Sequence, residues 1–446
     1  MALKGEILKA YNNLPAIPIE QPLGDLLNTI PVGDPALENP TSIVTLYVDA
    51  SGSDDTGDGS QANPYATPQT AIDAIPATAA EGAEYRIQCG AGIFPFPVLD
   101  RLPTQALIRI IGDRSNPTVS IPAGTGAFTQ DAGKEVRWTG TSVGYTDTIT
   151  DGSHWRLAIS PSSGSLIGGL VTASVSPSIS IIQSFNVTNS RNIEVYPYAT
   201  FFEVPDSSAV VNYGPRESSE AQRYSPNVRL VGIAIRNSGP SFEIFFGVSL
   251  NFQGCKIYKE PTASGLNIEL ERCTGSVYIE EFFTSASCQF TNAYFKPASW
   301  TIEGVGYNTA DSCILGTQVV VNSGGFLRVD NSDFEGTGAG TALAVFGSSP
   351  KLQVQNITVS GYTALLATSG SRLAGLEFGG TVTGSVTGNA ITLSNGAHAT
   401  GIEGACNGNL TAGGSEIVVG GNLGQTFASL PATDLGAGSP QLCRAT

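Results

Sequence analysis

Short apolar runs of β-type residues, each closed by turn residues, recur from Ile43 almost to the C-terminus of the chain. The clearest stretch is 228–360, where runs such as 228–235, 266–270 and 326–329 follow one another. Charged residues make up only 13% of the sequence, about half the usual share, while 53 glycines and 26 prolines supply turns. β-Branched strands joined by uncharged turns are typical of long all-β proteins, so the sequence predicts an all-β fold.

Five of these runs carry an anchor residue at a common position. The anchors are spaced 18, 15, 25 and 20 residues apart: Cys255, Cys273, Cys288, Cys313 and Asp333. A recurrence near ~20 residues is what one turn of a β-solenoid requires before the chain returns above itself. We therefore expect residues 43–372 to form a right-handed single-stranded parallel β-helix, a solenoid whose inward residues stack in ladders.

Two consecutive segments near the start of these runs match a known pattern. The segment 47–76, which opens YVDASGSDDTGDG, resembles the entry motif of the pectate-lyase-like right-handed parallel β-helix superfamily. In that motif a first strand, a Gly/Asp/Ser loop and a short helix cap the open end of the solenoid. Residues 85–94, YRIQCGAGIF, resemble the superfamily's first-coil strand and Gly-aromatic turn. The resemblance is one of sequence motifs over residues 47–112. In the rest of the chain it extends only to the general pattern of short apolar runs separated by turn residues.

A short capping helix is also predicted from the residues themselves. Four apolar side chains fall at helical spacing and would cover the first coil: Ala71, Ile72, Ala74 and Ile75. Pro68 suits the first turn of such a helix, and Pro76 ends it.

Residues 1–42 contain six prolines and no strand-like alternation, which predicts an extended Pro-rich arm that attaches to a partner. A flexible tail is the alternative. The first fifteen residues lack the apolar core of a signal peptide, so we expect no export by that route. The superfamily holds pectate lyases, glycoside hydrolases, epimerases and phage tailspikes. An unexported β-helix with such an arm resembles the tailspike and virion-fibre group.

This resemblance implies a bacteriophage virion structural protein, a homotrimeric spike or fibre made in the host cytoplasm and acting at the host cell surface. Residues 1–42 would bind other virion proteins. The β-helix would bind host surface polysaccharide as an adhesin during adsorption. The Gly-rich residues 373–446 would form terminal coils and a C-terminal cap with a trimer contact.

Several classes of function are excluded or disfavoured. The net charge of −16, without Lys/Arg clusters in the sequence, argues against nucleic acid as a partner. No apolar run approaches the ~18–20 residues that span a bilayer, so no membrane insertion is expected. With only His154 and His398, a histidine-centred triad is not predicted. The acidic loop 54–59 is followed by Tyr65 where a calcium loop needs a Glu, so we interpret it as a turn and expect no metal or cofactor.

Carboxylates are the candidates for catalysis, because glycosidic cleavage needs an acid and a second carboxylate ~5–9.5 Å apart. Strand alternation turns Glu269 and Glu271 to the same side of their run. A second set near the anchor positions could meet on one face: Asp311, Asp330, Asp333 and Glu335. The alternative function is therefore a polysaccharide depolymerase, a glycoside hydrolase in preference to a lyase. The lyase would need one of three bases: Arg272, Arg328 and Lys351. The same acids equally suit a solvated surface.

Eight aromatic residues suit either stacking on sugar rings or core packing, and their exposure decides between the two. They are Trp138, Trp155, Trp300, Tyr196, Tyr198, Tyr213, Tyr224 and Tyr307. Stacked cysteines would allow vertical disulfides, and we favour free buried thiols instead. These cysteines are Cys255, Cys273, Cys288 and Cys313, while Cys443 is the candidate for an interchain bond.

Overall fold

In the computed structural model all described residues belong to one compact unit, Asn39–Thr446. The described residues are 42–76, 82–99, 106–123, 127–131, 135–139, 149–161, 164–172, 178–182, 191–204, 210–213, 227–237, 242–246, 250–259, 268–271, 273–280, 282–296, 299–303, 306–338, 340–369, 372–373, 375–387, 391–394, 398–399, 402–403 and 410–412. Apart from Ser42, the predicted arm lies outside the described residues, and so does Cys443.

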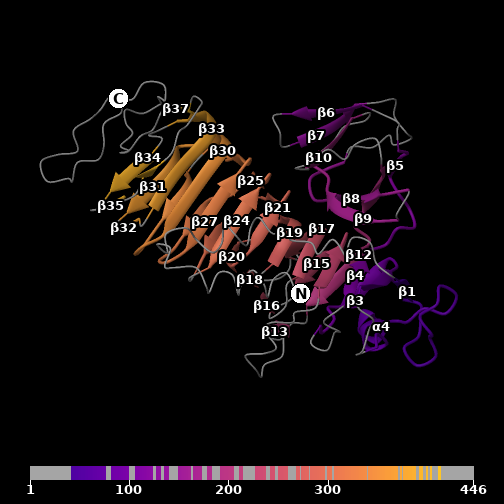
Figure 1. Ribbon diagram of the computed structural model, residues 1–446. Coiled ribbons are helices and arrows are strands. Elements are labelled where there is room, and N and C mark those ends of the chain that lie inside the picture. Colours follow the sequence, from indigo (N-terminus) through magenta and orange to yellow (C-terminus); the bar gives the residue numbers. More distant parts are fainter. Residues whose placement is uncertain are drawn as a thin grey trace, which may run out of the picture. The chain divides into compact units, whose positions relative to one another are not determined.

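Parallel strands from distant parts of the sequence pair side by side in a 19-stranded sheet (Figure 1). One ladder of this sheet runs in the order β1, β2, β4, β14, β17 and β19. These strands are β1 Ser42–Val48, β2 Ala83–Cys89, β4 Leu107–Ile111, β14 Asn227–Val231, β17 Leu250–Lys259 and β19 Cys273–Ile279. Another ladder joins β3 Gly92–Pro95, β12 Thr200–Val204 and β15 Ala234–Asn237 to the second half of β17.

Beyond β19 the two ladders continue through shorter strands and then meet again. The first contains β21 Gln289–Thr291, β24 Tyr307–Asp311 and β27 Phe326–Asp330. The second contains β22 Tyr294–Phe295, β25 Ile314–Leu315 and β28 Asp333–Glu335. Both start from β19 and both end on β30 Lys351–Tyr362, so eight parallel strands close into a ring.

The expected single-stranded parallel β-helix solenoid is therefore wrong, because the parallel sheet closes on itself in a barrel-like arrangement and further sheets are added to it. A corner separates the two ladders. The short strands are interrupted at a corner by Asn292, Ser312 and Asn331, whose φ angles of 56°, 56° and 46° lie in the left-handed region. Strand β30 turns at the same corner, where Asn356 has a φ of 49°, but its backbone stays paired on both sides of it, and β19 likewise pairs with both ladders. The recurrence of anchor residues every ~20 positions in the sequence predicts where the strands lie, but it does not determine how the ladders of strands pair with one another.

A nine-stranded sheet faces the same apolar core. Its strands are β13 Val210–Tyr213, β16 Phe242–Phe246, β18 Ile268–Glu271, β20 Phe283–Ala286, β23 Trp300–Ile302, β26 Val319–Val321, β29 Thr341–Val345, β31 Ala364–Ser369 and β34 Ile391–Ser394. All its strand pairings among the described residues are parallel. Between the sheets Phe283 stacks on Trp300 with ring centroids 5.6 Å apart, and Phe290 meets the same indole edge-on.

Two antiparallel sheets occupy the chain between β4 and β12, where no such insertion is predicted. One contains β5 Val119–Ile121, β11 Asn192–Pro197, β8 His154–Ile159 and β9 Leu166–Leu170. The other contains β10 Ser178–Ile182, β7 Glu135–Thr139 and β6 Ala127–Asp131. Trp155 and Leu157 of β8 pack with Ile111 and Val231 of the parallel sheet, so the first antiparallel sheet rests on the parallel strands.

The predicted helix is confirmed as α4, Pro68–Asp73. The Thr67 hydroxyl accepts a hydrogen bond from the backbone N–H of Thr70, and Ala71 and Ile72 are buried beside β1 and β2. The acidic loop is a turn, as expected. Asp54 accepts hydrogen bonds from the backbone N–H groups of Ala66 and Thr67, which uses the carboxylate to hold the chain before α4.

The four aligned cysteines are buried and none of them forms a disulfide, which confirms thiols over vertical disulfides. The expected single column is wrong, however. Cys255 pairs with Val277, whereas Thr274 pairs with Gln289 and so places Cys273 next to Cys288. The four cysteines belong to two neighbouring stacks of inward-facing residues, one on each side of the corner. The sequence does not distinguish the two stacks, because small residues suit the inward positions in both.

Candidate functional site

The six predicted carboxylates lie in three separate places. Asp311 and Asp330 end β24 and β27 and are register partners. Asp333 and Glu335 lie on β28, in the other ladder of the parallel sheet. Glu269 and Glu271 belong to β18 of the nine-stranded sheet, and their side chains lie outside the described residues. Among the candidates whose side chains are described, Asp311 and Asp330 are therefore the two that lie opposite each other on neighbouring strands.

Strict alternation turns this pair outward. Strand β24 buries Asn308 and Ala310, and β27 buries Leu327 and Val329. The remaining side chains of the two strands are half-buried and form what we term the β24/β27 face: Tyr307, Thr309, Asp311, Phe326, Arg328 and Asp330.

Asp330 is paired with a cation on its own strand. Arg328 Nε donates to Asp330 Oδ2 at 2.6 Å. Burial alone would lower the pKa of Arg328, but the charge of Asp330 and a hydrogen bond with Tyr307 raise it above its usual value. The guanidinium in turn favours the ionised form of the Asp330 carboxyl.

Asp311 is fixed by two neutral donors. The Ser312 hydroxyl and the Asn331 side-chain amide both donate to Asp311 Oδ1, each at 3.1 Å. Ser312 and Asn331 are the left-handed corner residues of their strands. The corner that joins the two ladders therefore also orients this carboxylate.

An aromatic pair lies at the other end of the same face. The rings of Tyr307 and Phe326 stack with centroids 4.5 Å apart and an interplanar angle of 19°. Each ring precedes the acid of its strand by four residues, or ~13 Å along the strand. The exposed Lys351 follows Phe326 in register. An extended ligand that lay along the strands would contact both the rings and the acids.

Three of the other predicted aromatic residues belong to the core instead. Trp155, Trp300 and Tyr196 are almost completely buried. Tyr198 is also well packed, and its hydroxyl donates to the Gly254 carbonyl at 2.8 Å. The side chains of Trp138, Tyr213 and Tyr224 lie outside the described residues. Tyr307 is thus the predicted aromatic residue that reaches a candidate site.

The ladder that holds Asp333 and Glu335 carries charges that already pair with one another. Lys296 Nζ lies 2.9 Å from Asp151 Oδ2, and Lys256 Nζ lies 3.3 Å from Glu280 Oε1. Beside them Tyr294 is buried, which together with the charge of Asp151 raises its pKa to about 12. These contacts fasten the loop at Asp151 to the parallel sheet.

Sequence reasoning missed two contributors to the β24/β27 face. Phe326 was not among the aromatic candidates, and Arg328 was considered only as a lyase base. The alternation of Phe326, Arg328 and Asp330 along one run is the signal that indicates them. Among the described residues no cluster of His, Cys, Asp and Glu suits a metal ion. No helix in the described part of the chain is long and apolar enough to cross a membrane.

No protein-family model and no curated protein matches the chain. Among solved structures it is similar to a "Glycoside hydrolase", with a TM-score of 0.29 and 8% identity, over 81% of this chain and 96% of that chain. It is also similar to "The complex structure of XylC with xylose", with a TM-score of 0.33 and 10% identity, over 76% of this chain and 70% of that chain. Scores this low carry no argument about fold or activity, and the resemblance to pectate-lyase-like β-helices and tailspikes is not confirmed.

Proposed function

We propose that the protein is a polysaccharide depolymerase of the glycoside hydrolase class and that its site is the β24/β27 face. The observation that carries the proposal is the register pairing of Asp311 with Asp330. Neighbouring parallel strands lie ~4.8 Å apart, which suits the ~5–5.5 Å between the carboxyl groups of retaining glycosidases. Inverting enzymes need ~6.5–9.5 Å to admit a water molecule, so the proposal specifies retention of configuration.

The two carboxyl groups take different roles. Asp330, held ionised by Arg328, attacks the anomeric carbon while the bond from that carbon to the glycosidic oxygen breaks. Asp311 gives its proton to the departing oxygen. Water then cleaves the glycosyl ester of Asp330 and returns a proton to Asp311.

The aromatic pair supports a polymeric substrate. A sugar unit packed against Tyr307 or Phe326 would lie ~13 Å from the acids, beyond the reach of one ring. Aromatic side chains offer apolar surface to the C–H groups of sugars, while Thr309 and Arg328 between rings and acids offer polar groups to sugar hydroxyls. Binding along the strands would place an internal glycosidic bond at Asp330.

The first test is release of reducing ends from purified candidate host surface polysaccharides. We expect release by the intact protein and a ~10²–10⁴-fold loss in both Asp311→Asn and Asp330→Asn. Asp333→Asn and Glu335→Gln are the matched controls, because they remove carboxylates from the other ladder, and both should keep full release. NMR of the first-formed product should show the anomeric configuration of the substrate.

Retained release in either Asp311→Asn or Asp330→Asn would contradict the assignment of this face. Binding without release by the intact protein would leave a sugar-binding role and remove the catalytic one. The homotrimer, attachment through residues 1–42 and a place on a virion stay predictions, since no contact among the described residues bears on them.

A further inference from the structure

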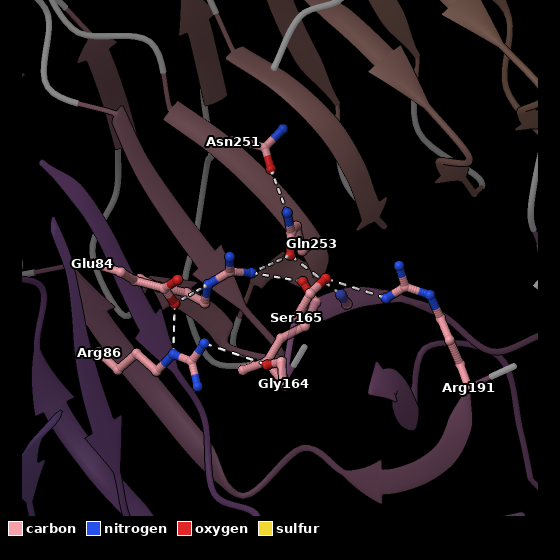
Figure 2. Close-up of polar contacts among 10 residues, drawn as sticks. Glu84, Arg86, Gly164, Ser165, Arg191, Asn251 and Gln253 are labelled. Atoms are coloured by element: carbon pink, nitrogen blue, oxygen red, sulfur yellow. Dashed lines mark hydrogen bonds and ion pairs between the residues drawn. The ribbon is translucent and has the colours of Figure 1, made fainter. Parts of the chain in front are cut away.

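Four arginines gather around β9, although the chain as a whole carries a net charge of −16. They come from four places in the sequence and form what we term the arginine cluster: Arg86 of β2, Arg109 of β4, Arg156 of β8 and Arg191 before β11. Figure 2 shows Arg86 and Arg191 on opposite sides of Gly164 and Ser165.

Three of the cluster arginines donate to the backbone or a side chain in or beside β9. Arg86 donates to the Gly164 carbonyl at 3.4 Å, and Arg191 donates to the Ser165 hydroxyl at 3.4 Å. Arg109 donates to the Leu166 carbonyl at 2.8 Å. These contacts use neutral acceptors, so they hold the guanidinium groups in place without balancing their charge.

Glu84 is the carboxylate that the described structure pairs with this cluster. Its Oε1 accepts from Arg86 Nε at 2.6 Å and from Arg109 Nε at 3.0 Å. Burial, together with the charges of Arg229 and Arg86, lowers the pKa of Arg109 to about 10 against the attraction of Glu84. One negative charge is therefore shared by two arginines, and the other two cluster members have no carboxylate partner among the described ion pairs.

Arg156 is the member that most requires a counter-ion. It is only 2% exposed, and neither its Nε nor its Nη1 has a hydrogen-bond partner. Its register neighbour on one side is Val195, part of an apolar cluster. On the other side is Gly169, where a Cβ would lie 2.5 Å from Arg156 Nη2, so the missing side chain makes room for the guanidinium. Burial and the charge of Arg191 lower the pKa of Arg156 only to about 10, so the group is cationic at neutral pH.

A buried cation without a partner costs several kcal/mol, and buried charges in proteins are normally paired. The planar fork of a guanidinium matches the oxygens of sulfate, phosphate and carboxylate groups in two-point contacts. We propose that Arg156 and Arg191 bind a small oxyanion, with Arg156 as its inner ligand and Arg191 as its outer one. The oxyanion is either a free inorganic ion or the carboxylate of an acidic sugar. Arg156 and Arg191 both lie on the antiparallel insertion, so the site does not depend on the proposed hydrolase function.

The test is thermal unfolding of the full chain in sodium sulfate and, separately, in sodium glucuronate, each compared with sodium chloride at equal ionic strength. We expect a rise in Tm that grows with the logarithm of the anion concentration and reaches roughly 1–3 °C at a hundredfold excess over Kd. A response to sulfate identifies a free inorganic oxyanion, and a response to glucuronate alone identifies a sugar acid.

Arg156→Met separates this binding from general salt effects, since sulfate also strengthens apolar burial in any protein. Removing an unpaired buried charge should leave Tm in chloride equal or higher, and the anion-specific rise should disappear. Lys296→Met is the matched control, because it removes an exposed cation elsewhere, and it should keep the full rise. Equal rises in the intact protein and in Arg156→Met, or no rise in either salt, would overturn the proposal. If Arg156→Met does not fold, Arg191→Met decides instead: a weaker response supports the site and an unchanged one overturns it.

Discussion

Asn308 is completely buried and holds together a chain of polar groups inside the apolar core. Its Oδ1 accepts from the Ser285 hydroxyl at 3.0 Å and from the backbone N–H of Cys288 at 3.1 Å. The Ser285 hydroxyl in turn accepts from Trp300 Nε1 at 2.7 Å. Such a network is stable only while every member is paired, so the amide matters more than its size suggests.

Asn308→Ala should lower the free energy of unfolding by about 2–4 kcal/mol, because it strands two buried donors at once. Thr309→Ala, on the outward side of the same strand, should change it by less than about 0.5 kcal/mol. Urea unfolding measures both. A loss of equal size in the two variants would mean that the network adds nothing.

The buried thiols give a second prediction at this scale. Burial raises the pKa of Cys255 and of Cys313 to about 12, so almost no reactive thiolate exists at neutral pH. In the variant Cys406→Ser/Cys443→Ser, the remaining five thiols should stay unreactive to a disulfide reagent until the protein is unfolded. Stoichiometric labelling of the folded variant would contradict their buried positions.

At the scale of the elements, the sequence predicted the parallel strands over 228–360 and helix α4 because both depend on local patterns of apolar side chains. It also named Asp311 and Asp330 among six candidate carboxylates; the structure makes these two register partners, and their catalytic role stays a prediction. The closure through β19 and β30 was not predictable, because pairing across the corner depends on tertiary geometry. For the same reason the contact of Arg328 with Asp330, and the separation of Asp333 from Asp311, became visible only in the structure.

The ion pair between β2 and β4 yields a pH prediction. The pKa of Glu84 is lowered: burial opposes this, but the hydrogen bond from Arg86 and the charges of Arg109 and Arg86 outweigh it. The ionised Glu84 therefore adds its full stabilisation to the folded protein above about pH 4.3, the usual pKa of Glu in an unfolded chain. This stabilisation is lost as the pH falls through the lower pKa that Glu84 has in the folded protein.

Glu84→Gln should destabilise by about 3–5 kcal/mol at neutral pH, because Arg109 stays buried without its partner. The variant should also show a shallower fall in stability below about pH 4.3 than the intact protein. Glu280→Gln, which breaks the more exposed pair with Lys256, should cost at most about 1 kcal/mol. Chemical unfolding across pH 3–7 measures the stability of the intact protein and of both variants. Parallel pH curves for Glu84→Gln and the intact protein would refute the assignment of this loss of stability to Glu84.

For the molecule as a whole, the packing of the first antiparallel sheet on the parallel sheet depends on the close approach of the Trp155 ring to the backbone of Gly232. Gly232 follows β14 with a φ of 62°, and a Cβ there would lie 2.2 Å from the Trp155 ring. The tryptophan packs directly on the backbone, so any side chain at this position would push the two sheets apart.

Gly232→Ala should therefore lower the free energy of unfolding by more than the cost of backbone strain alone, because the new Cβ also clashes with Trp155. Gly164 provides the comparison, since its φ of 64° is similar and nothing lies within 4 Å of a Cβ there. We expect Gly164→Ala to cost about 1–2 kcal/mol and Gly232→Ala clearly more, with a changed tryptophan fluorescence in Gly232→Ala alone. Equal costs for the two variants would show that the sheets separate without penalty.

The insertion also sets the order in which the chain can fold. Strand β27 meets β24 only 19 residues earlier in the chain, whereas Val228 of β14 pairs with Ile108 of β4 across about 120 residues. Contacts between distant residues form slowly, so the later strands have the kinetic advantage although they leave the ribosome last. All five residues of β4 are buried in the finished protein. At ~5–20 residues per second, this mostly apolar strand waits ~6–24 s during synthesis for its second neighbour, and in that interval it is most exposed to aggregation.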